Sequence, residues 1–321
     1  MTLRRLRELW DDFFFTPQSP LPIGLFRIFY GICVSATILL LHGDWLNWYG
    51  VHAWVSLPAM RQVEQGTRIN LFTVMPQDDR WIAAVFWVFL VCALMLTAGL
   101  WTRVSSIVVF LCLTSIQQRN LFILHGGDVF LRVSGFFLIF APAGAAFSVD
   151  RLLRVRRGLE AAEIEPRAPW AQRIIQCELA LMYLTSFLWK LKGQTWLDGT
   201  ALYYVFHLHS LARFPLPRWI QSTAVLKVGC WFTLALEFSL GVLIWFRRFR
   251  YPLLLLGLLF HLAIEYALNL PMFAWDVLAA YVLFIDPADL ARWWSAIRHL
   301  LGSVPERSMP LPESSDLSRN R

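Results

Sequence analysis

Charged residues are scarce in this 321-residue chain. Asp, Glu, Lys and Arg make up 16% of it, whereas a soluble domain carries about 25%. Hydrophobic residues make up 57%, and the mean hydropathy is +0.52. This composition excludes an ordinary soluble globular protein. Because several apolar runs are long enough to cross a bilayer, the sequence predicts an integral membrane protein.

The familiar motifs of cofactor and metal chemistry are also missing. The chain has no Walker loop, no dinucleotide-binding glycine fingerprint, no GxSxG elbow and no zinc-type spacing of Cys and His. Its five cysteines lie in five different apolar runs and form no CxxC pair. We therefore expect neither a disulfide framework nor a metal site.

The charges that are present follow the pattern of a membrane protein. The net charge is +7, but the basic residues occupy short loops between apolar runs, so we expect no nucleic-acid partner. The first apolar run lacks a small-residue cleavage site and is long enough to span, so it predicts a membrane helix rather than a cleaved signal.

The apolar runs predict an all-α, polytopic transmembrane helix bundle with about eight spans, and seven or nine spans remain open. The third predicted span is short, and the eighth contains Asp276. The predicted spans cover about 22–42, 81–100, 104–118, 129–147, 173–190, 223–246, 251–268 and 271–286.

Charge distribution then orients the bundle. With the N-terminus in the cytoplasm, the cytoplasmic segments carry about twice as many Lys and Arg residues as the external ones, as the positive-inside rule expects. Both termini are therefore predicted to be cytoplasmic, and the loops 43–80 and 191–222 external. We expect one transmembrane domain over residues 1–300. The Pro-, Ser- and charge-rich segment 301–321 is predicted to be a disordered cytoplasmic tail.

Lys190 is the first candidate for chemistry, because it ends the fifth predicted span at the external side. A desolvated lysine can lose its proton and act as a base. The alternative is a lysine that reaches to the lipid headgroups, which suits Lys192 well. Trp196 and Asp198-Gly199 follow within nine residues of Lys190 and indicate a shaped turn rather than a generic flank.

A second group lies at the start of the fourth predicted span, in the segment His125-Gly126-Gly127-Asp128. Asp128 suits the N-terminus of a helix, where the helix dipole favours negative charge. Arg132 follows at i+4 and could pair with Asp128. The segment is either a capped helix with an internal ion pair or a charged lid beside the lysine, and both hypotheses stay open.

His261 and Glu265 are separated by four residues on the seventh predicted span and share a face. They could form a carboxylate-oriented histidine or a buried pair that locks helices together. A metal site is disfavoured because no second His or Cys lies nearby. Glu178 and Glu237 are expected to form hydrogen bonds between helices, and Arg27 to reach the headgroups or bind a carboxylate.

Several blocks together resemble the HTTM family, bacterial membrane proteins related to vitamin K-dependent gamma-carboxylase. The resemblance runs from about residue 15 to residue 290. Its blocks are Gly24–Gly31, His125–Leu153, the stretch around Lys190, and Phe260–Phe284.

The resemblance implies that Lys190-Leu191 matches the lysine that deprotonates vitamin K hydroquinone, with Trp196, Asp198 and Gly199 following it. Lys192 remains a second match because the spacing to Trp196 is one residue longer. Phe260-His261 matches a Phe-His of the family, and Ser148-Val149-Asp150 matches its Ser-Val-Asp. The pattern departs at Gly126-Gly127-Asp128, where the carboxylase has an Asn-Asn-His that serves its active site.

Three functions follow as hypotheses. The first is a quinol-dependent, carboxylase- or epoxidase-like enzyme of the lyase class in the bacterial inner membrane. Its cofactor would be a quinol of the vitamin K hydroquinone or menaquinol type, with Lys190 as base and His261 with Glu265 relaying protons. The second is a non-catalytic accessory protein for maturation, export or immunity of a secreted peptide or protein. The third, a transporter or lipid-binding protein, is disfavoured because the sequence has no internal repeat.

Overall fold

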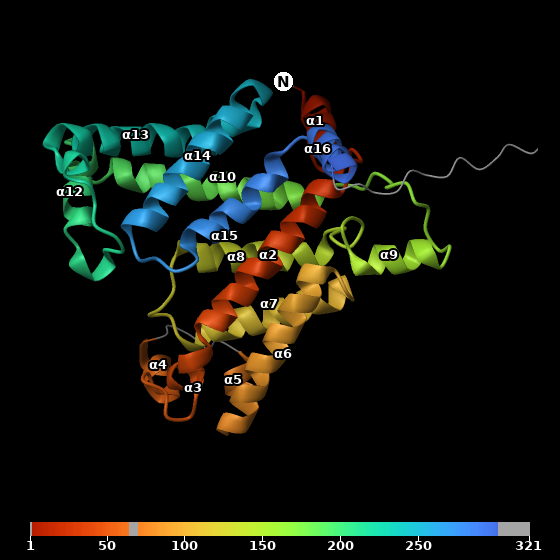
Figure 1. Ribbon diagram of the computed structural model, residues 1–321, viewed down its shortest axis with the longest axis horizontal. Helices are drawn as coiled ribbons and strands as arrows, with labels where there is room; N and C mark the ends of the chain where they lie inside the picture. The colour runs from red at the N-terminus through yellow and green to blue at the C-terminus, as the bar shows by residue number, and fades with distance from the viewer. Residues whose placement is uncertain (1, 64–69, 301–321) are drawn as a thin grey trace, which may run out of the picture.

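The protein is described by a computed structural model covering residues 2–63 and 70–300, and throughout these ranges the regular elements are helices (Figure 1). Only two isolated β-bridges occur there, Gln18 with Arg167 and Ala212 with Leu268. The all-α prediction is therefore confirmed. The predicted tail at 301–321 lies outside the described residues.

All eight segments predicted as spans contain a helix, but the helix of the fourth ends at Phe140, so its predicted extension to residue 147 is wrong. Among the described residues, five helices are long and apolar enough to cross a membrane: α2 (Leu21–Leu40), α6 (Asp79–Ala98), α10 (Trp170–Leu191), α13 with η4 (Thr223–Trp245) and α14 (Arg247–Ala267). The other three are α7 (Thr102–Arg119), α8 (Gly126–Phe140), and α15 (Phe273–Ala279) with η5 (Ala280–Phe284). These three are shorter or more polar, which is why the predicted number of eight spans stays a prediction.

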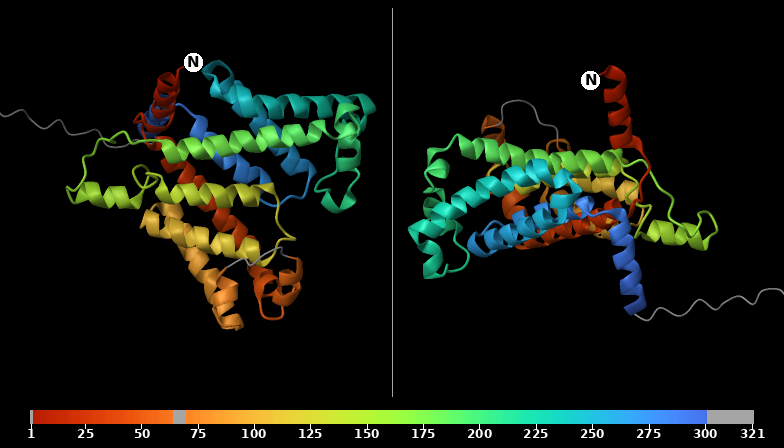
Figure 2. Two further views of the ribbon diagram at one scale, coloured as in Figure 1. Left: turned by 180° about the vertical axis from the view of Figure 1, so that it is seen from behind. Right: turned by 90° about the horizontal axis from the view of Figure 1, so that it is seen from above.

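Successive long helices run in opposite directions, so their ends gather in two sets (Figures 1 and 2). The α9 end, toward the upper right of Figure 1, carries α1 (Leu3–Phe15), α9 (Val149–Arg156) and α16 (Pro287–Leu300).

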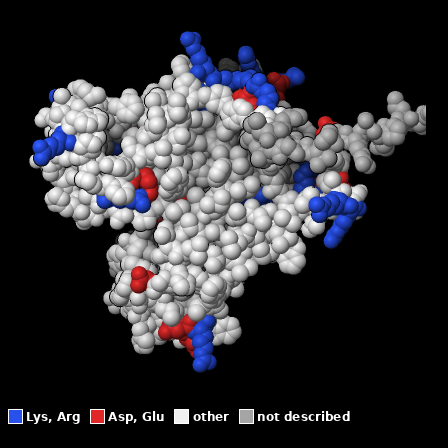
Figure 3. Space-filling model, viewed as in Figure 1, with Lys and Arg blue, Asp and Glu red and all other residues white. Residues whose placement is uncertain are grey.

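The opposite end, called the α12 end, carries the short helices of the two long loops. The surface between the two ends is mostly uncharged in the view of Figure 3. These helices are α3 (Trp45–Tyr49), α4 (Leu57–Val63), α5 (Leu71–Val74), α11 (Gln194–Leu197) and α12 (Ala201–Phe206).

Hydrogen bonds between distant segments fix both ends. At the α9 end, the Arg173 side chain donates to the Phe13 carbonyl at 3.2 Å. At the α12 end, the Asn269 N–H donates to the Leu211 carbonyl at 2.7 Å. The predicted orientation, with both termini in the cytoplasm, stays a prediction.

Arg27 is fully buried in α2 and donates to the carbonyls of Ala143 at 2.8 Å and Phe147 at 2.5 Å. The prediction that it reaches the headgroups or binds a carboxylate is wrong. The turn after α8 leaves several carbonyls without helical partners, and the guanidinium, with five N–H donors, satisfies them. Arg27 thereby joins the start of α2 to the segment that leads into α9.

Candidate functional site

A cavity of about 770 Å³ lies between α10, α13 and α14 and is closed at the α12 end by α11 and α12. Most of its lining is apolar, including Met182, Phe206 and Ile264. Both residues predicted to be catalytic, Lys190 and His261, line it, although they are 71 positions apart in the sequence. The structure therefore places them at one candidate site.

Lys190 points into the bundle. Its Nζ donates to Glu237 Oε1 at 2.7 Å and to Ser186 Oγ at 2.5 Å, and it lies 5.2 Å from the centroid of the Trp196 ring. The side chain of Lys190 is 21% exposed and that of Glu237 7%. Ser186 lies one helical turn before Lys190, so both face α13. Lys190 is thus an ion-paired group of the cavity wall.

The neighbouring residues of the predicted turn divide into two roles. Trp196 lies against Lys190 and lines the cavity, whereas Lys192 is exposed and packs over the Trp189 ring at 4.2 Å. Asp198 is exposed and accepts hydrogen bonds from the Thr200 N–H and hydroxyl at 3.0 and 2.6 Å. Asp198 therefore shapes the turn and takes no place in the cavity wall.

His261 is held by two tyrosines. Its Nε2 lies 2.7 Å from the Tyr183 hydroxyl, which lies 2.7 Å from the Tyr281 hydroxyl. Among the described residues, His261 Nδ1 has no hydrogen-bond partner. Sequence reasoning missed Tyr183, although it lies seven residues, or two helical turns, before Lys190 and so shares its face.

Glu265 does not orient His261. It forms an ion pair with Arg213, which comes from the segment after α12, and Arg213 also donates to the Glu265 carbonyl at 3.2 Å. The predicted His261–Glu265 pair is therefore wrong. Glu265 lies one turn nearer the end of α14, where the cationic Arg213 is available. His261 Nε2 is already occupied by the Tyr183 hydroxyl.

Asp128 caps α8. Its Oδ2 accepts the backbone N–H of His125 at 2.9 Å, and the His125 ring Nδ1 lies 3.5 Å from the same atom. Within the described ranges, Asp128 and Arg132 form no contact ion pair, although Arg132 is close enough to act on the carboxylate electrostatically. Asp128 instead takes part in a reciprocal capping box with His125.

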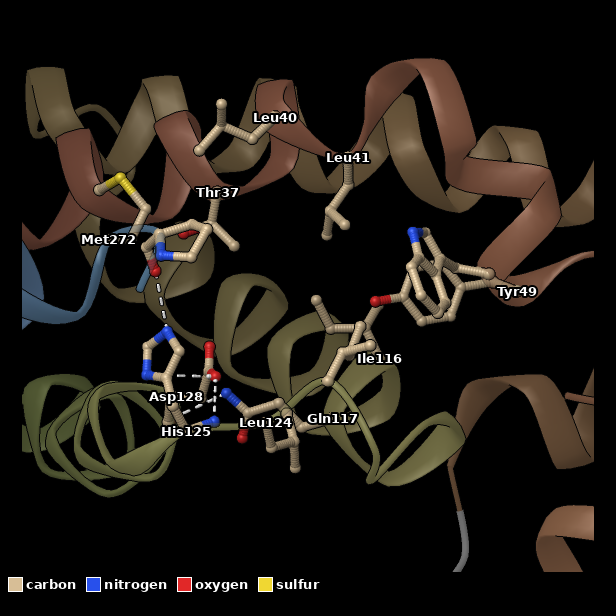
Figure 4. A pocket seen from close by; sticks show the side chains of 13 residues that line it. Thr37, Leu40, Leu41, Tyr49, Ile116, Gln117, Leu124, His125, Asp128 and Met272 are labelled. Atoms are coloured by element: carbon tan, nitrogen blue, oxygen red, sulfur yellow. Dashed lines mark hydrogen bonds and ion pairs between the residues drawn. The ribbon is translucent and has the colours of Figure 1, made fainter. Parts of the chain in front are cut away.

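Asp128 lines a smaller cavity of about 190 Å³ with Tyr49, Gln117 and Met272 (Figure 4). Neither Asp128 nor Arg132 lines the Lys190 cavity, which only Gly126 of this segment reaches. The hypothesis of a charged lid beside the lysine is therefore not supported by the geometry.

Ser148 and Asp150 lie at the α9 end and act as helix caps. Ser148 Oγ accepts the Arg151 N–H at 3.0 Å, and the Asp150 carboxylate accepts the Trp101 and Thr102 N–H groups at 2.8 Å each. Partial burial raises the pKa of Asp150, but these hydrogen bonds outweigh it and leave the pKa below its usual value. The Ser-Val-Asp match thus has a structural explanation.

The two predicted interhelical carboxylates are confirmed. Ser134 Oγ of α8 donates to Glu178 Oε2 of α10 at 2.9 Å, and Ser186 Oγ of α10 donates to Glu237 Oε1 of α13 at 3.0 Å. Glu237 has two roles beyond the predicted one, because it also forms an ion pair with Lys190 and lines the cavity.

An all-helical membrane protein with an apolar cavity and a few convergent polar groups is the class that fold and site define. Residues 15–288 match the HTTM domain. The chain belongs to the HTTM family, as its sequence blocks indicate, and is a membrane protein related to the gamma-carboxylases. No solved structure matches the chain.

Proposed function

We propose that the protein is a membrane enzyme that binds an apolar, hydroxyl-bearing molecule of the quinol class and removes its proton with the Lys190–Glu237 pair. The observation that carries this proposal is an ion pair, 2.7 Å long, in the wall of a largely apolar cavity. Buried ionisable groups inside a membrane are expensive to maintain and generally serve a site.

The cavity suits such a ligand in size and in access. Its volume of about 770 Å³ falls in the range of small-molecule pockets, about 300–1,000 Å³. Phe232 on α13 and Leu256 and Leu259 on α14 line it, yet are 45%, 40% and 54% exposed. The wall between these helices therefore meets the lipid, and an apolar ligand would enter there from the bilayer.

Two buried polar atoms of residues in the cavity wall, His261 Nδ1 and Glu237 Oε2, have no hydrogen-bond partner within the described part of the chain. A hydroxyl group could satisfy either of them. When Tyr281 donates to Tyr183 and Tyr183 donates to His261 Nε2, the proton of His261 lies on Nδ1 and can be donated into the cavity. In this arrangement of protons, Tyr183 orients the ring and leaves its donor N–H at Nδ1.

The Lys190–Glu237 pair acts as one base. Lys190 Nζ already donates to Glu237 and Ser186, so its lone pair becomes free only when a proton moves to Glu237 Oε1. Alternatively, the unpartnered Oε2 accepts the ligand's proton directly. Both routes end with one additional proton on the pair and an ammonium at Lys190, whose charge stabilises the anion left behind.

A bound quinol would supply reducing electrons and an acidic hydroxyl. The family relationship implies a carboxylase- or epoxidase-type reaction, with a secreted peptide or protein as the second substrate. The Lys- and Arg-rich α9 end would face the cytoplasm of a bacterial cell, so the cavity would open toward the outer half of the inner membrane.

The neighbouring lysines provide a matched test. The full chain and its Lys190→Met and Lys192→Met variants are reconstituted in nanodiscs with a reduced naphthoquinol in air-saturated buffer. The rate at which dioxygen, the electron acceptor, oxidises the quinol is measured. We expect a loss of about 100-fold or more for Lys190→Met, as is usual for removal of a general base. Lys192→Met should remain close to the unsubstituted protein. Equal rates for the protein and Lys190→Met would overturn the proposal.

The second candidate is an accessory protein for a secreted peptide, and one observation favours it. The segment after Lys190 presents Tyr203, Tyr204 and Trp219, which are 50%, 58% and 68% exposed. Such aromatic side chains suit a peptide-binding surface. In that case Lys190→Met would leave function unchanged in the host, whereas Tyr204→Ala with Trp219→Ala would abolish it.

A further inference from the structure

Three side chains meet at the α12 end, on the far side of Phe273 from the Lys190 cavity. They are His125 before α8, Asp128 in its first turn and Asp276 in α15, and their candidate ligand atoms all lie within 4.8 Å of one another. We propose that these three residues bind a divalent transition-metal ion such as Zn²⁺ or Mn²⁺. Imidazole nitrogen with carboxylate oxygens is a ligand set that both ions accept.

The distances suit coordination. His125 Nδ1 and Asp128 Oδ2 are 3.5 Å apart. Two ligands bound tetrahedrally at about 2.1 Å from one ion are about 3.4 Å apart. These two atoms therefore already have the spacing of a metal-bound pair, and only a small movement of Asp276 would complete the set.

Asp276 gives independent support. Its side chain is fully buried, and neither carboxylate oxygen accepts a hydrogen bond from a nitrogen or oxygen atom of the described residues. Besides His125 and Asp128, the Cys33 thiol of α2, a weak donor, lies close to this carboxylate. A buried carboxylate with so little compensation is unfavourable unless a cation or a proton neutralises it.

His125 has the arrangement of a metal-binding histidine. Its Nε2 lies 2.9 Å from the Pro271 carbonyl, which can only accept, so Nε2 carries the proton. The lone pair is therefore on Nδ1, beside Asp128, where it accepts a hydrogen bond from the Gly127 N–H at 3.1 Å that a bound ion would replace. Metal-binding histidines typically donate their other ring N–H to a carbonyl or carboxylate in this way. Figure 4 shows His125 and Asp128 together at the edge of the smaller cavity.

Gly127 leaves open the space between the ligands. A Cβ at this position would lie 3.0 Å from both His125 Nδ1 and Asp276 Oδ2. Even alanine would therefore crowd the place where an ion would lie. The backbone of α8 is regular at this position, so space and not backbone conformation explains the glycine.

A bound ion would join the start of α8 to α15. Phe273, in the first turn of α15, packs on the His125 ring with centroids 5.7 Å apart and on His261 at 5.9 Å. The ion would thereby stiffen the wall that holds His261. The metal site stands independently of the proposed base, because it shares no residue with the Lys190–Glu237 pair.

The test uses the full chain in detergent, treated with EDTA and then incubated separately with Zn²⁺, Mn²⁺ or Mg²⁺. Metal content is measured by mass spectrometry and stability by thermal unfolding. We expect about one Zn²⁺ or Mn²⁺ per chain and a rise in Tm of several degrees, since an ion that binds only the folded state stabilises it. Mg²⁺, which prefers oxygen ligands and retains its waters, should bind weakly.

Variants locate the site. Asp276→Asn and His125→Gln should lose the ion and the Tm rise. Gly127→Ala should weaken both, while Glu178→Gln, a buried carboxylate outside the cluster, should keep them. A folded unsubstituted chain that retains neither Zn²⁺ nor Mn²⁺ would overturn the proposal and leave a proton shared by Asp128 and Asp276. Retention of the ion by whichever of Asp276→Asn and His125→Gln folds would overturn it as well.

Discussion

At the scale of single residues, the neighbours of Lys190 determine whether its side chain faces the bundle or the outside. A lysine at the end of an apolar run is equally compatible with a headgroup contact and with a buried ion pair. Lys190 faces inward because its Nζ donates to Oε1 of Glu237, 47 residues later, at 2.7 Å. Lys192 instead lies on the outside, over the Trp189 ring. Two lysines separated by one residue thus have opposite environments, which the helical period explains because they face different sides of α10.

Tyr183 gives the residue-scale prediction. Its hydroxyl serves both His261 Nε2 and the Tyr281 hydroxyl in a buried site. Tyr183→Phe should therefore lower the free energy of unfolding by about 1–3 kcal/mol, since two buried groups lose a partner. Tyr266→Phe removes an exposed hydroxyl that donates to the Pro215 carbonyl and is the matched control. Denaturation in mixed micelles measures both; equal effects would contradict the role of Tyr183.

At the scale of elements, the helices were the most predictable feature. The length of the apolar runs alone located all eight segments. A span must be apolar along its whole length, because its side chains face either the lipid or the interior of the bundle. The short helices α3, α4, α11 and α12 were not predicted, since four to seven residues give too little periodicity. The Arg27 contacts were also missed, because backbone carbonyls that a turn leaves free have no sequence signature.

The turn into α7 gives the element-scale prediction. Asp150 binds the first N–H groups of α7, and its lowered pKa means that the folded state favours the carboxylate. This contribution is complete above the unfolded carboxyl pKa near 4 and is lost as the pH falls through the lower folded value. Asp150→Asn should destabilise the protein by about 1 kcal/mol at pH 7.

Thermal unfolding from pH 7 down to pH 3 measures this effect. The difference between the protein and Asp150→Asn should shrink toward the acidic limit. Ser148→Ala removes a neighbouring cap that does not titrate, so its effect should stay constant with pH. A pH-independent effect of Asp150→Asn would show that the charge of Asp150 contributes nothing.

At the scale of the whole molecule, the alternation of helices and the gathering of loops follow from the apolar map. The candidate site was predicted only in part. Lys190, His261 and Trp196 do meet at one cavity, whereas Asp128, Arg132, Glu265, Asp198 and Lys192 do not line it. Partners such as Arg213 for Glu265 come from loops whose path depends on packing, which a single sequence does not specify.

Orientation in the membrane gives the whole-molecule prediction. Glu163→Cys places an exposed thiol at the α9 end, and Ser210→Cys places one at the α12 end. In intact spheroplasts, a membrane-impermeant maleimide should label Ser210→Cys only, and both variants after permeabilisation. Labelling of Glu163→Cys instead would reverse the proposed orientation and place the cavity in the inner half of the bilayer.

The most direct measurement of the proposed chemistry is the absorption spectrum of a reduced naphthoquinol bound anaerobically to the protein in nanodiscs. At a pH where the free quinol is protonated, the spectrum of the bound molecule should be that of the quinolate anion for the unsubstituted protein and for Lys192→Met. Lys190→Met should bind the quinol and leave it protonated. A quinolate spectrum that persists in Lys190→Met, or a protonated quinol in all three proteins, would contradict the Lys190–Glu237 base.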